Sequence, residues 1–303
     1  MTFSAILTFA QKKPVDHSVY DQWENIGTKQ ITEKGKFVGF TVTPQAGDAN
    51  LFVKNPKTTE TVFSYPRSEN FSFTKDELFL AFIIKPSYHD VRNAKIKKKK
   101  ADDMPKDSLG ILNLNTRNLE KIAGVKSFSF PDKASNIIVY HLDKEPVDTT
   151  KSKKAVKKTD SDYFFADEET KPSSSKEGTT LVLKYLNSNS DINFKGVTSY
   201  LLSNNGSFLV YDCTDVKKDS TIKAGVYLFE TATKKTTALT LGKGIYKNFV
   251  FDENDKQLAY VGNQSAEKAL VKPFDLYFYN FKTNTATVLA SKNTIGMPND
   301  HTV

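Results

Sequence analysis

The sequence predicts an all-β fold, a β-propeller built from four-stranded antiparallel blades. Three observations lead to this prediction. The chain holds 22 Phe and 13 Tyr but only 1 Trp and 3 Met, and Phe and Tyr suit the half-buried face of a sheet. A polar turn followed by an apolar run that ends on an aromatic residue recurs five times, and a second alternating run follows each copy. Two hairpins per repeat supply the four strands of one blade.

The first hairpin of each repeat is marked by a turn rich in Asp, Gly, Asn and Lys. Gly and Asn accept a positive φ at little cost, so such turns connect antiparallel strands tightly. A short apolar strand precedes the turn, as at 71–73, 128–130 and 249–251. The copies of the turn with its following strand are 32–40, 74–82, 132–140, 203–211 and 252–260.

The second hairpin shows alternating apolar residues, a polar turn and a Thr-rich return strand. Alternation with period two is typical of a strand, and the return strands 236–240 and 285–289 complete the hairpin. The copies are 50–58, 110–117, 181–187, 225–233 and 275–283.

The spacing of the repeats supports a propeller. The terminal aromatic residues are 42, 58, 71 and 49 residues apart, whereas one blade takes about 40–50 residues. The two long gaps hold low-complexity inserts, at 94–106 and 148–178, and removing these brings every gap near one blade. We therefore expect about five blades between residues 15 and 303. A pair of β-sandwiches, the alternative, predicts no fixed period. The aromatic residues are Phe40, Phe82, Tyr140, Tyr211 and Tyr260.

The start of the chain resembles the later part of a secretory signal peptide. Residues 1–11 are weakly apolar and close on a small residue, Ala10, although no basic segment precedes them. The alternative is a frayed N-terminus. No other stretch approaches the length of a membrane-spanning helix. We therefore expect a truncated signal peptide at 1–11, no membrane span, and a periplasmic or secreted protein.

The positive charge is concentrated in the two inserts. Lys plus Arg outnumber Asp plus Glu by 43 to 35, a formal charge of +8, and ten lysines lie in two clusters within 95–100 and 151–158. A polyanion-binding arm is one interpretation. The clusters lack interleaved aromatic residues for base stacking, which favours solvated loops and no nucleic-acid partner. We expect the insert at 148–178 to be unstructured.

No catalytic apparatus is evident in the sequence. It contains no Walker loop, HExxH or GxGxxG motif, and the nearest approach to a nucleophile elbow, 262–266, has the wrong spacing. Its single cysteine excludes a disulfide framework and any multi-cysteine metal site. We predict no catalytic, cofactor-binding or metal-ligating residue, and no cofactor. The candidates considered and set aside are His17, His89, His141, His301, Cys213 and the acidic pair Glu168–Glu169.

Two stretches carry a family resemblance. One runs from Tyr20-Asp-Gln-Trp23 to Leu51, and the other is a lysine run followed by Asp103-Met-Pro-Lys-Asp-Ser-Leu-Gly110. Both resemble the N-terminal propeller of S9-family, prolyl oligopeptidase-like serine peptidases, particularly the secreted kind common in Bacteroidetes. The resemblance covers residues 15–303, and 296–298 looks like the lead-in to a further blade.

The resemblance implies a role rather than a reaction. In that family a propeller of seven or eight blades precedes an α/β-hydrolase domain with a Ser-Asp-His triad, and no residue of this sequence matches the triad motifs. The propeller is then incomplete and not an enzyme on its own. It would gate the access of peptide substrates to a hydrolase domain that this chain lacks. The alternative is a free-standing five-bladed propeller that binds a ligand or a protein.

Overall fold

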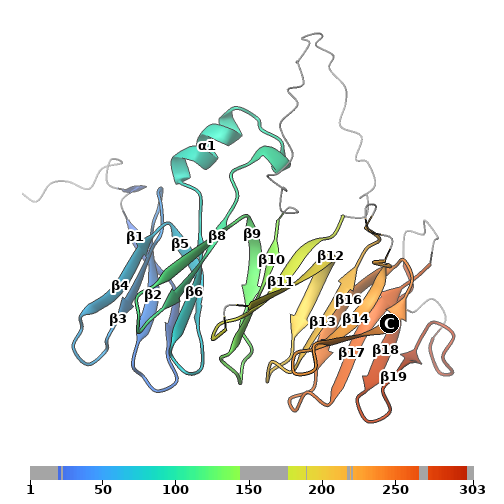
Figure 1. The fold of residues 1–303 in the computed structure, drawn as a ribbon. Helices are drawn as coiled ribbons and strands as arrows, with labels where there is room; N and C mark the ends of the chain where they lie inside the picture. The colour runs from blue at the N-terminus through green and yellow to red at the C-terminus, as the bar shows by residue number, and fades with distance from the viewer. Residues whose placement is uncertain are drawn as a thin grey trace, which may run out of the picture. The chain divides into compact units, whose positions relative to one another are not determined.

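The computed structural model describes residues 20–21, 23–143, 177–188, 190–216, 219, 221–265 and 272–298. It confirms the predicted fold class, because antiparallel β-strands make up most of this part of the chain (Figure 1). The chain forms two compact units, 1–73 with 79–121 and 74–78 with 122–303. The signal-like residues 1–11 and residues 148–176 of the second insert lie outside the described residues.

The first unit contains two four-stranded antiparallel sheets, each with its strands in chain order. These are the first two blades. The first blade consists of β1 (Glu24–Ile31), β2 (Val38–Pro44), β3 (Asn50–Lys54) and β4 (Thr61–Pro66). The second consists of β5 (Ser68–Phe73), β6 (Phe79–Ile84), β7 (Ser108–Asn113) and β8 (Leu119–Ala123).

A helical insert separates β6 from β7. Helix α1 (Tyr88–Ile96) begins where the Ser87 hydroxyl accepts a hydrogen bond from the amide of Asp90 (3.1 Å), and a short 3-10 helix, η2 (Ala101–Asp103), follows. A solvated loop at 94–106 is predicted from charge alone, whereas α1 extends into this segment because Ser87 caps its first turn. The lysines from Lys95 to Lys100 are exposed, as that prediction requires.

The core of the first unit lies between facing sheets. Leu51 and Val53 of β3 pack in one cluster with Phe71 and Phe73 of β5, and all four side chains are buried. Gly39 on β2 is required for this contact, because a Cβ at that position would lie 2.5 Å from the ring of Phe71. The absent side chain lets the two sheets approach closely.

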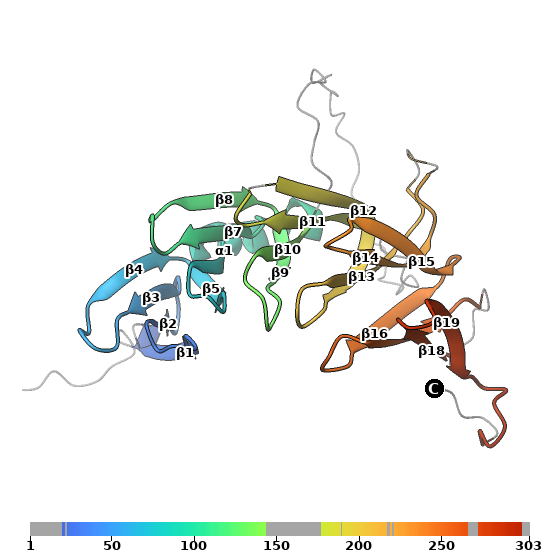
Figure 2. The ribbon, with the colours of Figure 1, turned by 60° about the horizontal axis from the view of Figure 1, so that its bottom comes forward.

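The second unit contains a seven-stranded sheet and a four-stranded sheet. The larger sheet can be followed from β9 to β15 in Figure 2. Its strands are β9 (Val125–Ser129), β10 (Ile137–Leu142), β11 (Thr179–Tyr185), β12 (Ser190–Leu202), β13 (Phe208–Cys213), β14 (Gly225–Glu230) and β15 (Lys235–Leu241). The smaller sheet has β16 (Ile245–Phe251), β17 (Gln257–Asn263), β18 (Asp275–Asn280) and β19 (Thr285–Ala290).

The seven-stranded sheet is two blades that share one strand. The first half of the 13-residue strand β12 pairs with β11, and the second half, from Val197 to Leu202, pairs with β13. Gly196 interrupts the strand with a positive φ of 70° at the change of partner. β12 is thus the fourth strand of one blade and the first strand of the next. Counted in this way, the described residues form the five blades that the repeat predicted.

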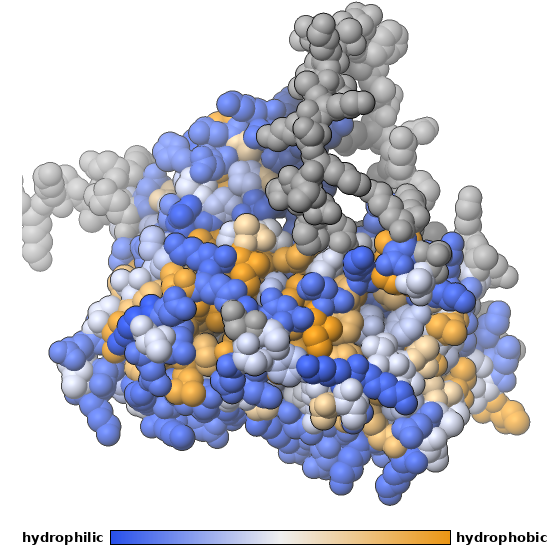
Figure 3. Space-filling view, viewed as in Figure 1, coloured by the Kyte–Doolittle hydropathy of each residue, from blue (hydrophilic) through white to orange (hydrophobic). Residues whose placement is uncertain are grey.

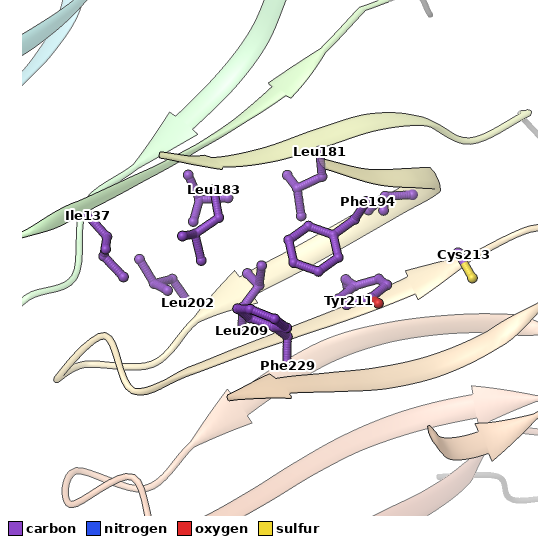
Figure 4. Packing of buried hydrophobic residues seen from close by; sticks show 11 residues of the cluster. Ile137, Leu181, Leu183, Phe194, Leu202, Leu209, Tyr211, Cys213 and Phe229 are labelled. Atoms are coloured by element: carbon purple, nitrogen blue, oxygen red, sulfur yellow. The ribbon is translucent and has the colours of Figure 1, made fainter. Parts of the chain in front are cut away.

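Two apolar clusters hold the second unit together. In the first, Leu181 and Leu183 of β11 face Leu209 and Phe229 across the sheet layers, with Phe194 between them (Figure 4). In the second, residues of β13 and β14 pack against the next blade. This second cluster includes Val210, Val226, Leu228, Tyr246, Leu258, Tyr260, Tyr277 and Tyr279.

The turn between the first and second strands has the same geometry in four blades. Its fourth residue has a positive φ, and its amide donates to the carbonyl of the first residue at 2.8–3.0 Å. Glu77 and Asp255 adopt this conformation where other copies have glycine. The four turns are Thr32–Gly35, Thr74–Glu77, Ser203–Gly206 and Asp252–Asp255.

The turn between the third and fourth strands also repeats. Its fifth residue is left-handed in four blades, at Thr59, Arg117, Lys234 and Asn284. In three of these the first residue is an asparagine whose side-chain oxygen accepts an amide hydrogen two residues on, as Asn280 does from Lys282 (2.8 Å). The turn ends of the blades are mainly hydrophilic, whereas the apolar residues in view lie over the middles of strands (Figure 3).

Hydrogen bonds also join the turns of neighbouring blades in the second unit. The buried Asp255 carboxylate accepts from the amides of Asn204 (3.0 Å) and Asn205 (2.7 Å). The Asn204 side chain donates to the backbone carbonyl of Asp252 (3.2 Å). The backbone carbonyl of Asn204 accepts from the amide of Lys133 (2.7 Å). Three consecutive blades are therefore tied together at their turns.

We predict that Asp255→Asn lowers the free energy of unfolding by about 1–3 kcal/mol, because a buried amide loses its charged acceptor. Asparagine tolerates a positive φ, so the backbone cost stays small. Urea denaturation measures the change. The matched control, Glu253→Gln, removes an exposed carboxylate 3.9 Å from Lys133 and should alter stability by less than about 0.5 kcal/mol. Equal effects of the two substitutions would contradict the structural role of Asp255.

Candidate functional site

The histidines set aside in the sequence do not form a catalytic group in the described part of the chain. His141 on β10 is 3% exposed, and its Nε2 lies 3.0 Å from the Val197 carbonyl and 2.9 Å from the Thr179 hydroxyl. Because that hydroxyl donates to the Leu142 carbonyl (2.6 Å), Nε2 carries the proton and donates to both neighbours. His89 is exposed on α1, and His17 and His301 lie outside the described residues.

Burial lowers the pKa of His141, and the nearby positive charge of Lys126 lowers it further. The imidazole is therefore neutral at physiological pH and acts as a hydrogen-bond donor between strands. Its partners are backbone and hydroxyl oxygens rather than a nucleophile. The arrangement joins strands β10, β11 and β12 inside the seven-stranded sheet.

Cys213 has the properties of a core residue. It is 5% exposed at the end of β13, in the cluster drawn in Figure 4, and its thiol lies 3.1 Å from the carbonyl of Lys223. Burial raises the pKa of Cys213 to about 12, with the negative charge of Asp212 as a further cause. A thiol with this pKa is a poor nucleophile at neutral pH.

Residues 262–265, the described part of the elbow-like stretch, do not form a nucleophile elbow. Gly262 and Asn263 belong to β17, and the Asn263 side chain accepts from the amide of Ser265 (3.0 Å). A polar hollow of about 310 Å³ opens beside these residues, lined also by Asp275 and Lys292 but by no histidine.

A buried carboxylate that the sequence analysis missed lies on β13. Asp212 accepts hydrogen bonds from the hydroxyls of Thr198 and Ser199 and from the Ser199 amide (3.0 Å). Burial raises its pKa, and these hydrogen bonds oppose the shift. The only hint in the sequence was an aspartate inside an apolar run. With its oxygens satisfied by strand β12, this group serves the sheet rather than a ligand.

Charged side chains gather instead around a cavity in the first unit, which we call the insert pocket. It has a volume of about 360 Å³ and lies where the 47–49 loop, the start of β5 and both ends of the helical insert meet. Its lining residues are Gly47, Asp48, Ala49, Arg67, Glu69, Lys85, Pro86, Tyr88, Val91, Met104, Pro105 and Asp107. This volume falls in the range of about 300–1,000 Å³ that is typical of small-molecule sites.

Two contacts hold the insert around the pocket. The Lys85 ammonium lies 2.8 Å from the Asp107 carboxylate, joining the two ends of the insert. The Asp48 carboxylate accepts from the amide of Tyr88 (2.7 Å), which fixes the start of α1 to the loop between β2 and β3. Glu69 of strand β5 also lines the pocket. The string that carried the family resemblance, 103–110, forms one wall of this pocket and then enters β7.

The described residues contain no group of three His, Cys, Asp or Glu side chains placed to bind a metal ion. The lysines of 95–100 are exposed on and after α1, while the second lysine cluster and Glu168–Glu169 lie outside the described residues. Among the described helices, none has the length and apolar character needed to cross a membrane.

No family model and no curated protein sequence matches the chain. Solved structures resemble it in fold. The β-propeller domain of the Trilobed protease from Pyrococcus furiosus, described as having an open velcro topology, is 11% identical over 88% of this chain and 72% of its own, with a TM-score of 0.45. The acylaminoacyl peptidase of Pyrococcus horikoshii is 10% identical over 90% of this chain, with a TM-score of 0.45.

TolB from Acinetobacter baumannii is 12% identical over 87% of this chain and 53% of its own, with a TM-score of 0.38. This chain spans only 41% of the acylaminoacyl peptidase. At such identities the likeness concerns the fold alone, and no residue role follows from it.

We predict that acid destabilises this fold through His141. The pKa of His141 is lowered in the folded state, so its contribution to stability is complete above the unfolded value of 6.5 and is lost as pH falls towards the folded value. Urea denaturation at pH 7.5 and at pH 5 measures how far the free energy of unfolding falls between the two pH values. This fall should be smaller for His141→Gln than for the unaltered chain. His89→Gln, which removes an exposed histidine, should leave the pH dependence unchanged. The same pH dependence in all three proteins would refute this assignment.

Proposed function

We propose that this chain is the non-catalytic propeller portion of an S9-type serine peptidase, and that it restricts which peptides reach a hydrolase domain carried by a longer chain. The observation that carries the proposal is the string 103–110, whose resemblance to that family is specific, set within a propeller of repeated blades. The periplasmic or secreted location suggested by residues 1–11 is part of the same proposal.

The chemistry of the described residues is compatible with a gate. The buried polar groups His141, Cys213 and Asp212 are each engaged with neighbouring strands, so none is presented to a substrate. A rigid β scaffold placed before an active site can select substrates by size without contributing to bond cleavage. The proposal therefore assigns the chain a steric role and no catalytic residue.

A second candidate function is a free-standing propeller that binds a ligand or a protein. The insert pocket favours it, because the pocket is lined by charged and aromatic groups and is held in place by the Lys85–Asp107 ion pair. In this case no hydrolase domain is needed. The two functions are compatible if the propeller both restricts access to a hydrolase domain and binds peptides.

We predict that the purified chain does not hydrolyse short chromogenic peptides. A natural longer chain that includes these residues and a hydrolase domain should hydrolyse them and should spare folded proteins. Deleting residues 15–303 from that longer chain should extend cleavage to larger substrates, because the steric restriction is removed. Turnover by the 303-residue chain that a serine-directed reagent inhibits would refute the non-catalytic role. Unchanged size selectivity after the deletion, in a hydrolase that still cleaves short peptides, would refute gating.

A further inference from the structure

We propose that the insert pocket binds a short zwitterionic peptide of two or three residues, with Arg67 holding its carboxylate and Glu69 its ammonium group. The site does not depend on a hydrolase domain, so it stands or falls separately from the gating role. The proposal follows from the charges around the pocket, from their burial and from the shape of the apolar walls.

Five charged side chains line the pocket, and three of them are already engaged. Lys85 and Asp107 neutralise each other at 2.8 Å, and Asp48 accepts from the amide at the start of α1. The Arg67 guanidinium and the Glu69 carboxylate have no ion-pair or hydrogen-bond partner among the described residues. The pocket is thus left with one positive and one negative group to offer a ligand.

Arg67 and Glu69 share one side of the chain. Arg67 directly precedes β5 and Glu69 is its second residue, with the buried Ser68 between them, and both line the insert pocket. Both are half-buried, and both line the same cavity. Because removing a charge from water is unfavourable unless a partner replaces the water, each gains from a ligand group of opposite charge.

The backbone at Arg67 holds its side chain in place. Its φ is 57°, a left-handed conformation that favours glycine. The Arg67 carbonyl accepts from the amide of Lys85 (2.7 Å), and the next amide, of Ser68, donates to the carbonyl of Ala49 (3.1 Å). Segments from β3, β5 and β6 therefore fix this residue although its backbone is strained. Gly124 has the same conformation (φ 70°) between β8 and β9, and its carbonyl accepts from the amide of Asp143 (2.7 Å), so the positive φ belongs to the turn between blades.

The ligand class follows from the opposite charges of the two groups. A guanidinium binds a carboxylate through two parallel hydrogen bonds, and a carboxylate accepts from an ammonium group. A molecule that carries both ends on a short flexible chain matches this pair, and a peptide is such a molecule. The remaining walls, Tyr88, Val91, Met104 and Pro105, are apolar or aromatic and suit small side chains. A cavity of about 360 Å³ limits the peptide to a few residues.

Isothermal titration calorimetry of the purified chain with tri-alanine tests the site. We expect saturable binding of tri-alanine and at least about tenfold weaker binding of N-acetyl-tri-alanine and of tri-alanine amide, because each lacks one charged end. No saturable binding of tri-alanine up to about 10 mM, or equal affinity for the three ligands, would overturn the proposal.

Variants assign the two groups. Arg67→Met and Glu69→Gln should each weaken tri-alanine binding at least about tenfold, with Arg67→Met removing the preference for the free carboxylate and Glu69→Gln the preference for the free amine. The matched controls Arg92→Met, on α1, and Glu24→Gln, on β1, alter exposed charges outside the pocket and should leave affinity unchanged. Retained affinity in either pocket variant would overturn the assignment of that residue, and retained affinity in both would overturn the site.

Arg67→Gly separates binding from folding. Glycine relieves the left-handed backbone, so this variant should unfold at the same temperature as the unaltered chain or a few degrees higher, about the shift expected from removing such strain. The same variant should lose tri-alanine binding. Unaltered binding by Arg67→Gly would show that the guanidinium has no part in the site.

Discussion

Face-to-face packing of four-stranded blades is the interaction on which the rest of this structure depends. Consecutive residues of one strand serve different cores: Leu209 packs into the cluster with the preceding blade, and Val210 packs into the cluster with the following blade. A strand buried on both sides reads as a continuous apolar run rather than as strict alternation. The run Phe208–Tyr211 in β13 is such a case, and the same requirement explains Gly39, where a side chain would hold two sheets of the first unit apart.

The turns fix the register in which successive strands of each blade pair. A positive φ at the fourth residue of the first turn and at the fifth residue of the last turn recurs in four blades each, so that each strand returns with its apolar residues on the correct face. In the second unit the turns also bond to one another, through Asp255 and Asn204. The polar ends of the blades thus contribute to the cohesion of the second unit.

Polar groups of the blades and polar groups of the insert have different roles. His141, Asp212 and Cys213 are satisfied by neighbouring strands, so their shifted pKa values reflect burial within the scaffold. Charged groups also surround the cavity beside the insert: Lys85 and Asp107 of the insert pair with each other, whereas the side chains of Arg67 and Glu69, at the start of β5, have no protein partner among the described residues. Loops positioned by a rigid scaffold commonly carry function. One of the two stretches that resemble the S9 propellers, 103–110, contributes Met104, Pro105 and Asp107 to the lining of this cavity.

The sequence alone determined the fold class, the five-fold repeat and most strand positions, because turn chemistry and apolar patterning are local properties of the chain. It also excluded the stretch around Ser265 as a nucleophile elbow by spacing. Only the tertiary structure decided that β12 serves two blades, that Ser87 starts a helix within a lysine-rich insert, and that Arg67 and Glu69 share a cavity with Tyr88. These features depend on which distant segments meet, and neither composition nor period carries that information.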